Sequence, residues 1–194
     1  MISRQQAISL IGEHVQNKNI VKHMYAVEAM MEGLYDYFKN TGRSFEGTKE
    51  EWELAGLLHD GDYCPDVPEN MQGIQITIWA KEKGLDVPEN VSHAMASHNR
   101  DNTKVEPASL MDFGLFIGDS LTGLIVATAL VLPSKKLSDV KVDSVLKKFR
   151  QKAFASGTRR DDISLCEEKL NLSLKDFIEI CLKSMQAISE DLGL

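Results

Sequence analysis

A histidine and an aspartate stand side by side at the end of an apolar run: His59 and Asp60 follow Leu58 and precede Gly61. Imidazole nitrogens and carboxylate oxygens are both good ligands for divalent metal ions. Neighbouring side chains on a continuous helix point about 100° apart, so the pair can share one ion only if the helix ends there. Gly61 permits such a break, and Pro65 prevents the helix from resuming soon after it. We therefore predict that His59 and Asp60 form half of a metal site at the end of a helix.

The other half of such a site must come from elsewhere in the chain, and three residues are placed for it. His23 and His98 each lie on or beside an apolar helical face, where a histidine is either a metal ligand or a hydrogen-bonded core residue. Asp119 lies in the middle of a long apolar stretch. An unpaired buried carboxylate costs several kcal/mol, so it needs a cation, a partner or a raised pKa. A metal ion shared with His23 and the His59-Asp60 pair meets that need.

These residues lie on segments whose hydrophobic pattern is helical. Apolar residues recur at spacings of three and four from Ile20 to Phe38, beside His23. Thr48 and Glu51 have the spacing of a capping box, which predicts the start of the helix that ends at residues 59–60. Further helices are expected over about 3–16, from Met71 to Gly84, from Pro88 through His98, over 109–131 and over 173–192, with an amphipathic basic segment at 134–155. No stretch alternates for long with the period of a strand, so we predict a single all-α domain.

The composition is that of a soluble globular protein: 43% of the residues are hydrophobic, 26% are charged, and the formal net charge is −7. This negative charge argues against general nucleic-acid binding. Residues 113–132 are long enough to span a membrane, but a carboxylate in mid-segment favours a core helix buried on all sides. Its glycines, Gly114, Gly118 and Gly123, predict close approach by neighbouring helices. The three cysteines show no CxxC spacing and the N-terminus shows no secretory pattern, so we expect a cytoplasmic protein without a membrane partner.

Taken in order along the chain, the candidate residues resemble those of a known family. The segments that carry them are Lys22-His23-Met24, Ala55-Gly56-Leu57-Leu58-His59-Asp60, His93-Ala94-Met95-Ala96-Ser97-His98-Asn99 and Asp119-Ser120-Leu121-Thr122-Gly123. This ordered set is similar to that of the HD-domain superfamily of metal-dependent phosphohydrolases. The later segments Pro133-Ser134-Lys135-Lys136 and Lys147-Lys148-Phe149 resemble one small bacterial and archaeal HD subfamily. The resemblance covers nearly the whole chain.

The resemblance implies a compact helical HD-domain bundle with a metal site between helices, a core over about 18–132, and C-terminal helices at about 134–192 packed on it. The residues implied as ligands of one divalent ion are His23, His59, Asp60 and Asp119. Two nitrogen and two oxygen donors suit Mn, Fe, Co, Ni or Zn. The implied activity is hydrolysis of a small phosphate ester, such as a nucleotide, by a metal-activated water. Asp60 or a neighbour orients that water, and His98 donates a proton or holds the phosphate.

The chain departs from the family pattern in one place. Relatives often carry a histidine soon after the HD helix, but residues 68–73 contain none. Sites with two metal ions need extra histidines, and only His93 and His98 remain for that role. They lie about 140° apart around a helix, so one site is not expected to use both. We therefore predict a single ion, with His98 behind a ligand or beside the substrate, and with His93 and His14 at the surface.

Several roles stay open on the sequence alone. Asp62 and Glu28 either orient the ligand histidines or serve as solvated or capping residues. The basic segment after Pro133 and the Arg159-Arg160 pair either contact phosphate or form a solvated charged face, and we favour the solvated face. The HD protein either acts on a small phosphorylated substrate or is a non-catalytic module in which a structural metal supports binding of a ligand or partner. A third alternative is a helical interaction protein whose histidines are core residues.

Overall fold

The chain folds entirely into helices and the turns between them, as predicted. The computed structural model describes residues 1–194. The α-helices are α1 (Arg4–His14), α2 (Lys18–Asn40), α3 (Lys49–Leu58), α4 (Gln75–Glu82), α5 (Glu89–His98), α6 (Arg100–Thr103), α7 (Leu110–Leu130), α8 (Val142–Phe149), α9 (Arg160–Ile163), α10 (Leu174–Ala187) and α11 (Ser189–Leu192). Short 3₁₀ turns occur at Glu69–Met71 and Leu137–Asp139, and a π turn occurs at Cys166–Leu170. One continuous cluster of buried apolar side chains extends from Ile2 to Leu192.

Helices α2 and α3 pack against each other, and three of the four residues predicted to bind metal lie on α2 or directly after α3. The apolar stripe of α2 faces the core, with Met24 and Val27 fully buried. Thr48 and Glu51 form the predicted capping box, in which the Thr48 hydroxyl accepts the N–H of Glu51 and the Glu51 carboxylate accepts the N–H of Thr48. Both predictions are confirmed, and the packing brings His23 of α2 against the end of α3.

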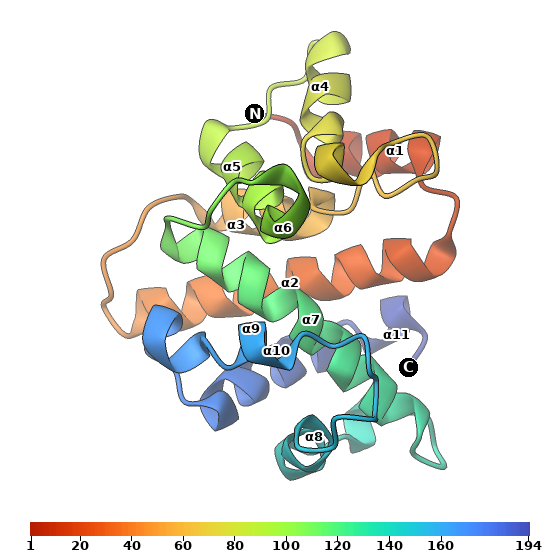
Figure 1. Cartoon of the computed structure of the whole chain (residues 1–194), viewed down its shortest axis with the longest axis vertical. Helices are drawn as coiled ribbons and strands as arrows, with labels where there is room; N and C mark the ends of the chain where they lie inside the picture. Colours follow the sequence, from red (N-terminus) through yellow and green to blue (C-terminus); the bar gives the residue numbers. More distant parts are fainter.

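Helix α7 runs through the middle of the molecule and crosses α2 (Figure 1). It packs against α2, α5, α8, α9 and α10. It is the one helix long and apolar enough to span a membrane, but 61% of its most apolar window is buried inside the protein. The predicted core helix is therefore confirmed, although it is not buried on all sides, because Asp119, Ser120 and Gly123 are partly or fully exposed.

Two of the three glycines of α7 lie where a neighbouring element approaches closely. A Cβ atom on Gly114 would lie 3.3 Å from the Trp52 ring, and one on Gly118 would meet the Met30 side chain. A Cβ atom on Gly123 would meet nothing within 4 Å. The prediction of close approach is confirmed for Gly114 and Gly118 and is wrong for Gly123, which borders open space.

Some helix boundaries differ from the predictions. The helix expected from Met71 begins only at Gln75, after Gly73, whose φ of 87° is incompatible with a continuing helix. The basic segment over 134–155 is α-helical only at Val142–Phe149. The last expected helix is interrupted at Ile188, between α10 and α11. Segments this short have no hydrophobic period long enough to predict their ends.

The contact between α2 and α3 depends on Gly56. A Cβ atom there would lie 2.7 Å from the Val27 carbonyl oxygen and 2.8 Å from the Glu28 Cα atom, and backbone atoms cannot rotate away. We expect Gly56→Ala to lower the free energy of unfolding by about 1–3 kcal/mol, because α3 must move away from α2. Unfolding in urea, followed by circular dichroism, measures this loss.

Gly12→Ala in α1 is the matched control, because a Cβ atom meets nothing within 4 Å there. Alanine favours a helix over glycine, so this variant is expected to gain about 0.5–1 kcal/mol. A Gly56→Ala protein as stable as the Gly12→Ala protein would show that the two helices do not need the glycine.

Candidate metal centre

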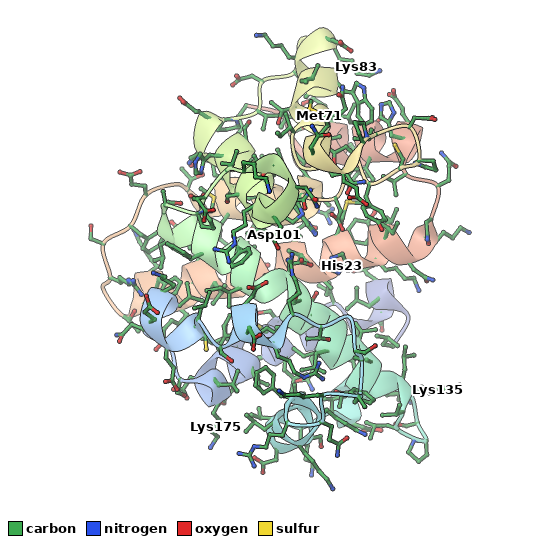
Figure 2. All side chains as sticks on the ribbon, in the orientation of Figure 1. His23, Met71, Lys83, Asp101, Lys135 and Lys175 are labelled. Carbon is green, nitrogen blue, oxygen red and sulfur yellow. The ribbon has the colours of Figure 1, made fainter.

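The five side chains predicted to act in the site come together between four helices. His23 lies on α2, His59 and Asp60 follow the end of α3, His98 ends α5, and Asp119 lies near the middle of α7. Figure 2 shows His23 near the middle of the molecule, whereas the labelled lysines lie towards its edges. The site is therefore held by elements that are far apart in the sequence.

The imidazole Nε2 atoms of His23 and His59 face each other at 3.2 Å. Asp119 Oδ1 lies 3.0 Å from His23 Nε2 and 3.9 Å from His59 Nε2. Asp60 Oδ2 lies 3.7 Å and 3.5 Å from the same two nitrogens. Donor atoms of His23, His59 and Asp60 all lie within 4.8 Å of one another. These three residues form one compact group, and Asp119 adds an oxygen within 3.9 Å of both nitrogens.

Backbone carbonyl groups determine which nitrogen carries the proton in two of the rings. His59 Nδ1 donates a hydrogen bond to the Gly56 carbonyl oxygen at 2.8 Å, and His98 Nδ1 donates to the Met95 carbonyl oxygen. A neutral imidazole protonated at Nδ1 has its lone pair on Nε2. The Nε2 atom of His59 is therefore available as a ligand atom.

The Thr122 hydroxyl orients His23 in the same way. This hydroxyl donates to the Asp119 carbonyl oxygen at 2.8 Å and so accepts from His23 Nδ1, which lies 3.3 Å away. The Nε2 lone pairs of neutral His23 and His59 then point at each other and repel unless a cation lies between them. Burial lowers the pKa of His23, but the hydrogen bond and the charge of Asp119 outweigh burial and raise that pKa overall.

Burial and charge set the protonation state of the cluster. Burial lowers the pKa of His59 to about 4, so this ring is neutral near pH 7. Burial raises the pKa of Asp60, but the neighbouring His59 and His98 outweigh it and bring the pKa to about 2. Burial likewise raises the pKa of Asp119, and His23 outweighs it and holds the pKa below its usual value. Ionised carboxylates beside a neutral imidazole are the state that a divalent cation binds.

Asp119 is less buried than predicted and has protein partners. Its side chain is 18% exposed and opens, with His23, into a pocket of about 440 Å³. Arg159 lines the same pocket, and its Nη2 lies 3.3 Å from Asp119 Oδ2. The favoured interpretation of Arg159 as part of a solvated face is therefore wrong. Other basic residues, such as Lys135 and Lys147, are exposed as predicted.

Asp62 and Glu28 do not contact the site histidines. Asp62 is fully buried and accepts hydrogen bonds from the backbone N–H groups of Gly73 at 2.8 Å and Ile76 at 3.0 Å. Glu28 binds Arg4 of α1 through both carboxylate oxygens, at 2.6 and 2.8 Å. Of the two roles left open for these carboxylates, the contacts favour the structural one: Asp62 caps the start of α4, and Glu28 ties α1 to α2.

His98 and His93 point to different places, as their spacing predicts. His98 Nε2 lies 3.5 Å from Asp60 Oδ1, and only 6% of the residue is exposed. It lies behind Asp60 and does not line the pocket beside Asp119. His93 is half-exposed, and its Nδ1 lies 2.9 Å from Asp112 Oδ2, in the N-terminal cap of α7.

The chain turns sharply after α3, but not by the predicted means. Gly61 does not adopt a positive φ, and its N–H bonds to the Leu58 carbonyl oxygen at 2.9 Å. A Cβ atom on Gly61 would lie 3.1 Å from the Ile76 side chain, so the close approach of α4 favours glycine there. Residues 68–73 add no ligand, and the structure contains one cluster of candidate ligands.

Gly56 and Thr122 belong to the site, and the sequence analysis did not assign them a role. Gly56 precedes His59 by three residues, and Thr122 follows Asp119 by three. Residues at that spacing are neighbours on a helix, so each could be found by asking what lies one turn from a ligand.

No family model, curated protein or solved structure matches this chain.

Proposed function

We propose that the protein is a metal-dependent phosphohydrolase of the HD superfamily, acting on a small phosphate ester such as a nucleotide. One observation carries the proposal: the Nε2 atoms of His23 and His59 face each other at 3.2 Å, with Asp119 Oδ1 at 3.0 Å from the first. Together with Asp60, these residues would hold one divalent ion, and their donor set suits Mn, Fe, Co, Ni or Zn. The order of the four residues along the chain, which resembles that of HD proteins, supports the same assignment.

When bound, the ion supplies Lewis-acid catalysis to the hydrolysis of a phosphate ester. Asp60 Oδ2 faces the two ligand histidines, and its Oδ1 faces His98 Nε2 at 3.5 Å. Burial lowers the pKa of His98, but the contact with Asp60 outweighs burial and raises that pKa. We propose that Asp60 orients the attacking water and that His98 holds Asp60 in position. The water oxygen bonds to phosphorus, the ester P–O bond breaks, and the proton released by water goes to the leaving alcohol.

The proposal is tested on protein purified without chelators. Elemental analysis is expected to find one divalent ion per chain, or one to bind on addition. A panel of phosphate esters, including nucleotides, is then assayed with added manganese, cobalt, nickel and magnesium, and release of inorganic phosphate is expected from at least one ester. Protein that neither contains nor binds an ion would overturn the proposal. An ion-binding protein that hydrolyses no ester would favour the non-catalytic HD module.

A further inference from the structure

Two adjacent arginines near the site, Arg159 and Arg160, make different kinds of contact. Arg160 turns away from the metal centre and donates to the carbonyl oxygens of Phe149 at 2.7 Å, Gln151 at 3.1 Å and Ala155 at 3.3 Å. These residues belong to the segment over 149–159, called the connecting arm below, which leads from α8 to α9 (Figure 1). The arm contains turns and no helix after Phe149, and the Arg160 side chain adds hydrogen bonds to several of its carbonyl groups.

Arg159 lies at the end of the connecting arm and points to the metal centre. Its Nη2 lies 3.3 Å from Asp119 Oδ2, and its single Nε–H is shared between Ser120 Oγ at 3.3 Å and Asp162 Oδ2 at 3.2 Å. A guanidinium group has five N–H donors, so three are left without a partner here. The side chain is 36% exposed and lines the pocket beside Asp119, where a ligand can reach it.

The pocket beside the metal centre has the chemistry of an anion site. Its walls are His23 and Asp119 on one side and the connecting arm from Ala155 to Arg159 on the other. Arg159 is the one lysine or arginine among the lining residues, and three hydroxyl-bearing residues, Ser120, Ser156 and Thr158, line the same pocket. A planar arginine fork matches two oxygens of a phosphate group, and hydroxyl groups can donate to the others.

We propose that the connecting arm is a phosphate-binding element, in which Arg160 holds the arm in shape and Arg159 binds phosphate oxygens beside the metal ion. The inference rests on the proposed function, because the arm serves a centre that binds phosphate esters. Arg159 also contacts Asp119, so the same side chain positions a ligand carboxylate when no phosphate is present. Lysine cannot replace it fully, since an ammonium group offers no planar fork.

The test measures binding of inorganic phosphate to the manganese-loaded protein by calorimetry. Arg159→Ala is expected to weaken phosphate binding by about 10–100-fold, and Arg159→Lys to weaken it less. Both variants are expected to keep one ion per chain and to raise KM more than they lower kcat. Arg150→Ala is the matched control, because Arg150 is an exposed arginine of the same arm, and it is expected to bind phosphate as the wild type does.

Arg160→Ala tests the other half of the proposal. It is expected to expose the arm to limited proteolysis between residues 149 and 158 and to weaken phosphate binding while Arg159 is present. The inference would be overturned if Arg159→Ala bound phosphate as tightly as the wild type, or if Arg150→Ala lost as much affinity as Arg159→Ala. Neither result would contradict the proposed ester hydrolysis. If phosphate binding depends on Arg159 but the protein hydrolyses no ester, the anion site is retained and the proposed hydrolase activity is overturned. A wild-type protein that binds no phosphate would overturn the arm's role.

Discussion

Asp60→Ala is expected to abolish ion binding and ester hydrolysis together. Asp60 provides an oxygen 3.5 Å from His59 Nε2 and 3.7 Å from His23 Nε2, and it is the carboxylate nearest to both His59 and His98. Without it, the ion keeps one carboxylate, so its charge is less well neutralised and its coordination is incomplete. The side chain assigned to orient water is lost as well.

The loss of ion binding in Asp60→Ala can also be measured through the stability of the protein, without an activity assay. An ion present at about 1,000 times its Kd raises the free energy of unfolding by about 4 kcal/mol. For a domain of this size that corresponds to a rise in Tm of about 8–16 °C. The wild type is expected to show this rise on addition of the ion, and Asp60→Ala is expected to show none.

Asp66→Ala is the control, because Asp66 is an exposed carboxylate in the loop after the site. It is expected to behave as the wild type in elemental analysis, in thermal unfolding and in the ester panel. An Asp60→Ala protein that still binds one ion per chain with an unchanged rise in Tm would remove Asp60 from the ligand set.

Among the variants that keep the ion site, Asp62→Ala is expected to lose the most stability. This carboxylate is fully buried and accepts the N–H groups of Gly73 and Ile76, which have no other partner. Hydrogen bonds to a charged group contribute about 1.5–3 kcal/mol each, and alanine leaves both donors unsatisfied. We expect a loss of about 3 kcal/mol, or a fall in Tm of about 6–12 °C.

Asp62→Asn separates the hydrogen bonds from the charge. The amide keeps one acceptor oxygen, so this variant is expected to lose less than half as much stability as Asp62→Ala. Thermal unfolding in excess chelator measures both variants without any contribution from an ion. If Asp62→Ala loses the ion but not stability, then Asp62 acts on the metal centre and not on α4.

The sequence predicted the parts of the fold that depend on long hydrophobic periods. The stripe from Ile20 to Phe38 and the capping box at Thr48 gave α2 and α3, because the pattern and the cap act within a few residues. Gly61 shows the limit of such inference. From its position, Gly61 was predicted to provide an unusual backbone conformation. In the structure its small size matters instead, because a larger side chain would collide with α4. That contact depends on packing between distant residues.

The residues that come together in the candidate site could be selected from the sequence, but their partners could not. His23, His59, Asp60 and Asp119 could be selected because a histidine or carboxylate on an apolar helix needs an explanation. Arg159 could not be selected, because a run of charged residues gives no sign of which side chain turns inward. In the structure Arg160 binds carbonyl groups of the connecting arm, whereas Arg159 contacts Asp119.

The order of the proposed ligands along the chain also has a consequence for folding kinetics. His23 lies on α2, and His59 and Asp60 directly follow α3, whereas Asp119 lies on α7. Closing a longer loop costs more entropy, by about 0.6 kcal/mol for each doubling of its length, so the pairing of α2 with α3 is favoured over their docking to α7. A divalent ion present during refolding is therefore expected to find three ligands before the fourth is in place. It then acts as a template that accelerates refolding, in addition to slowing the unfolding of the finished protein.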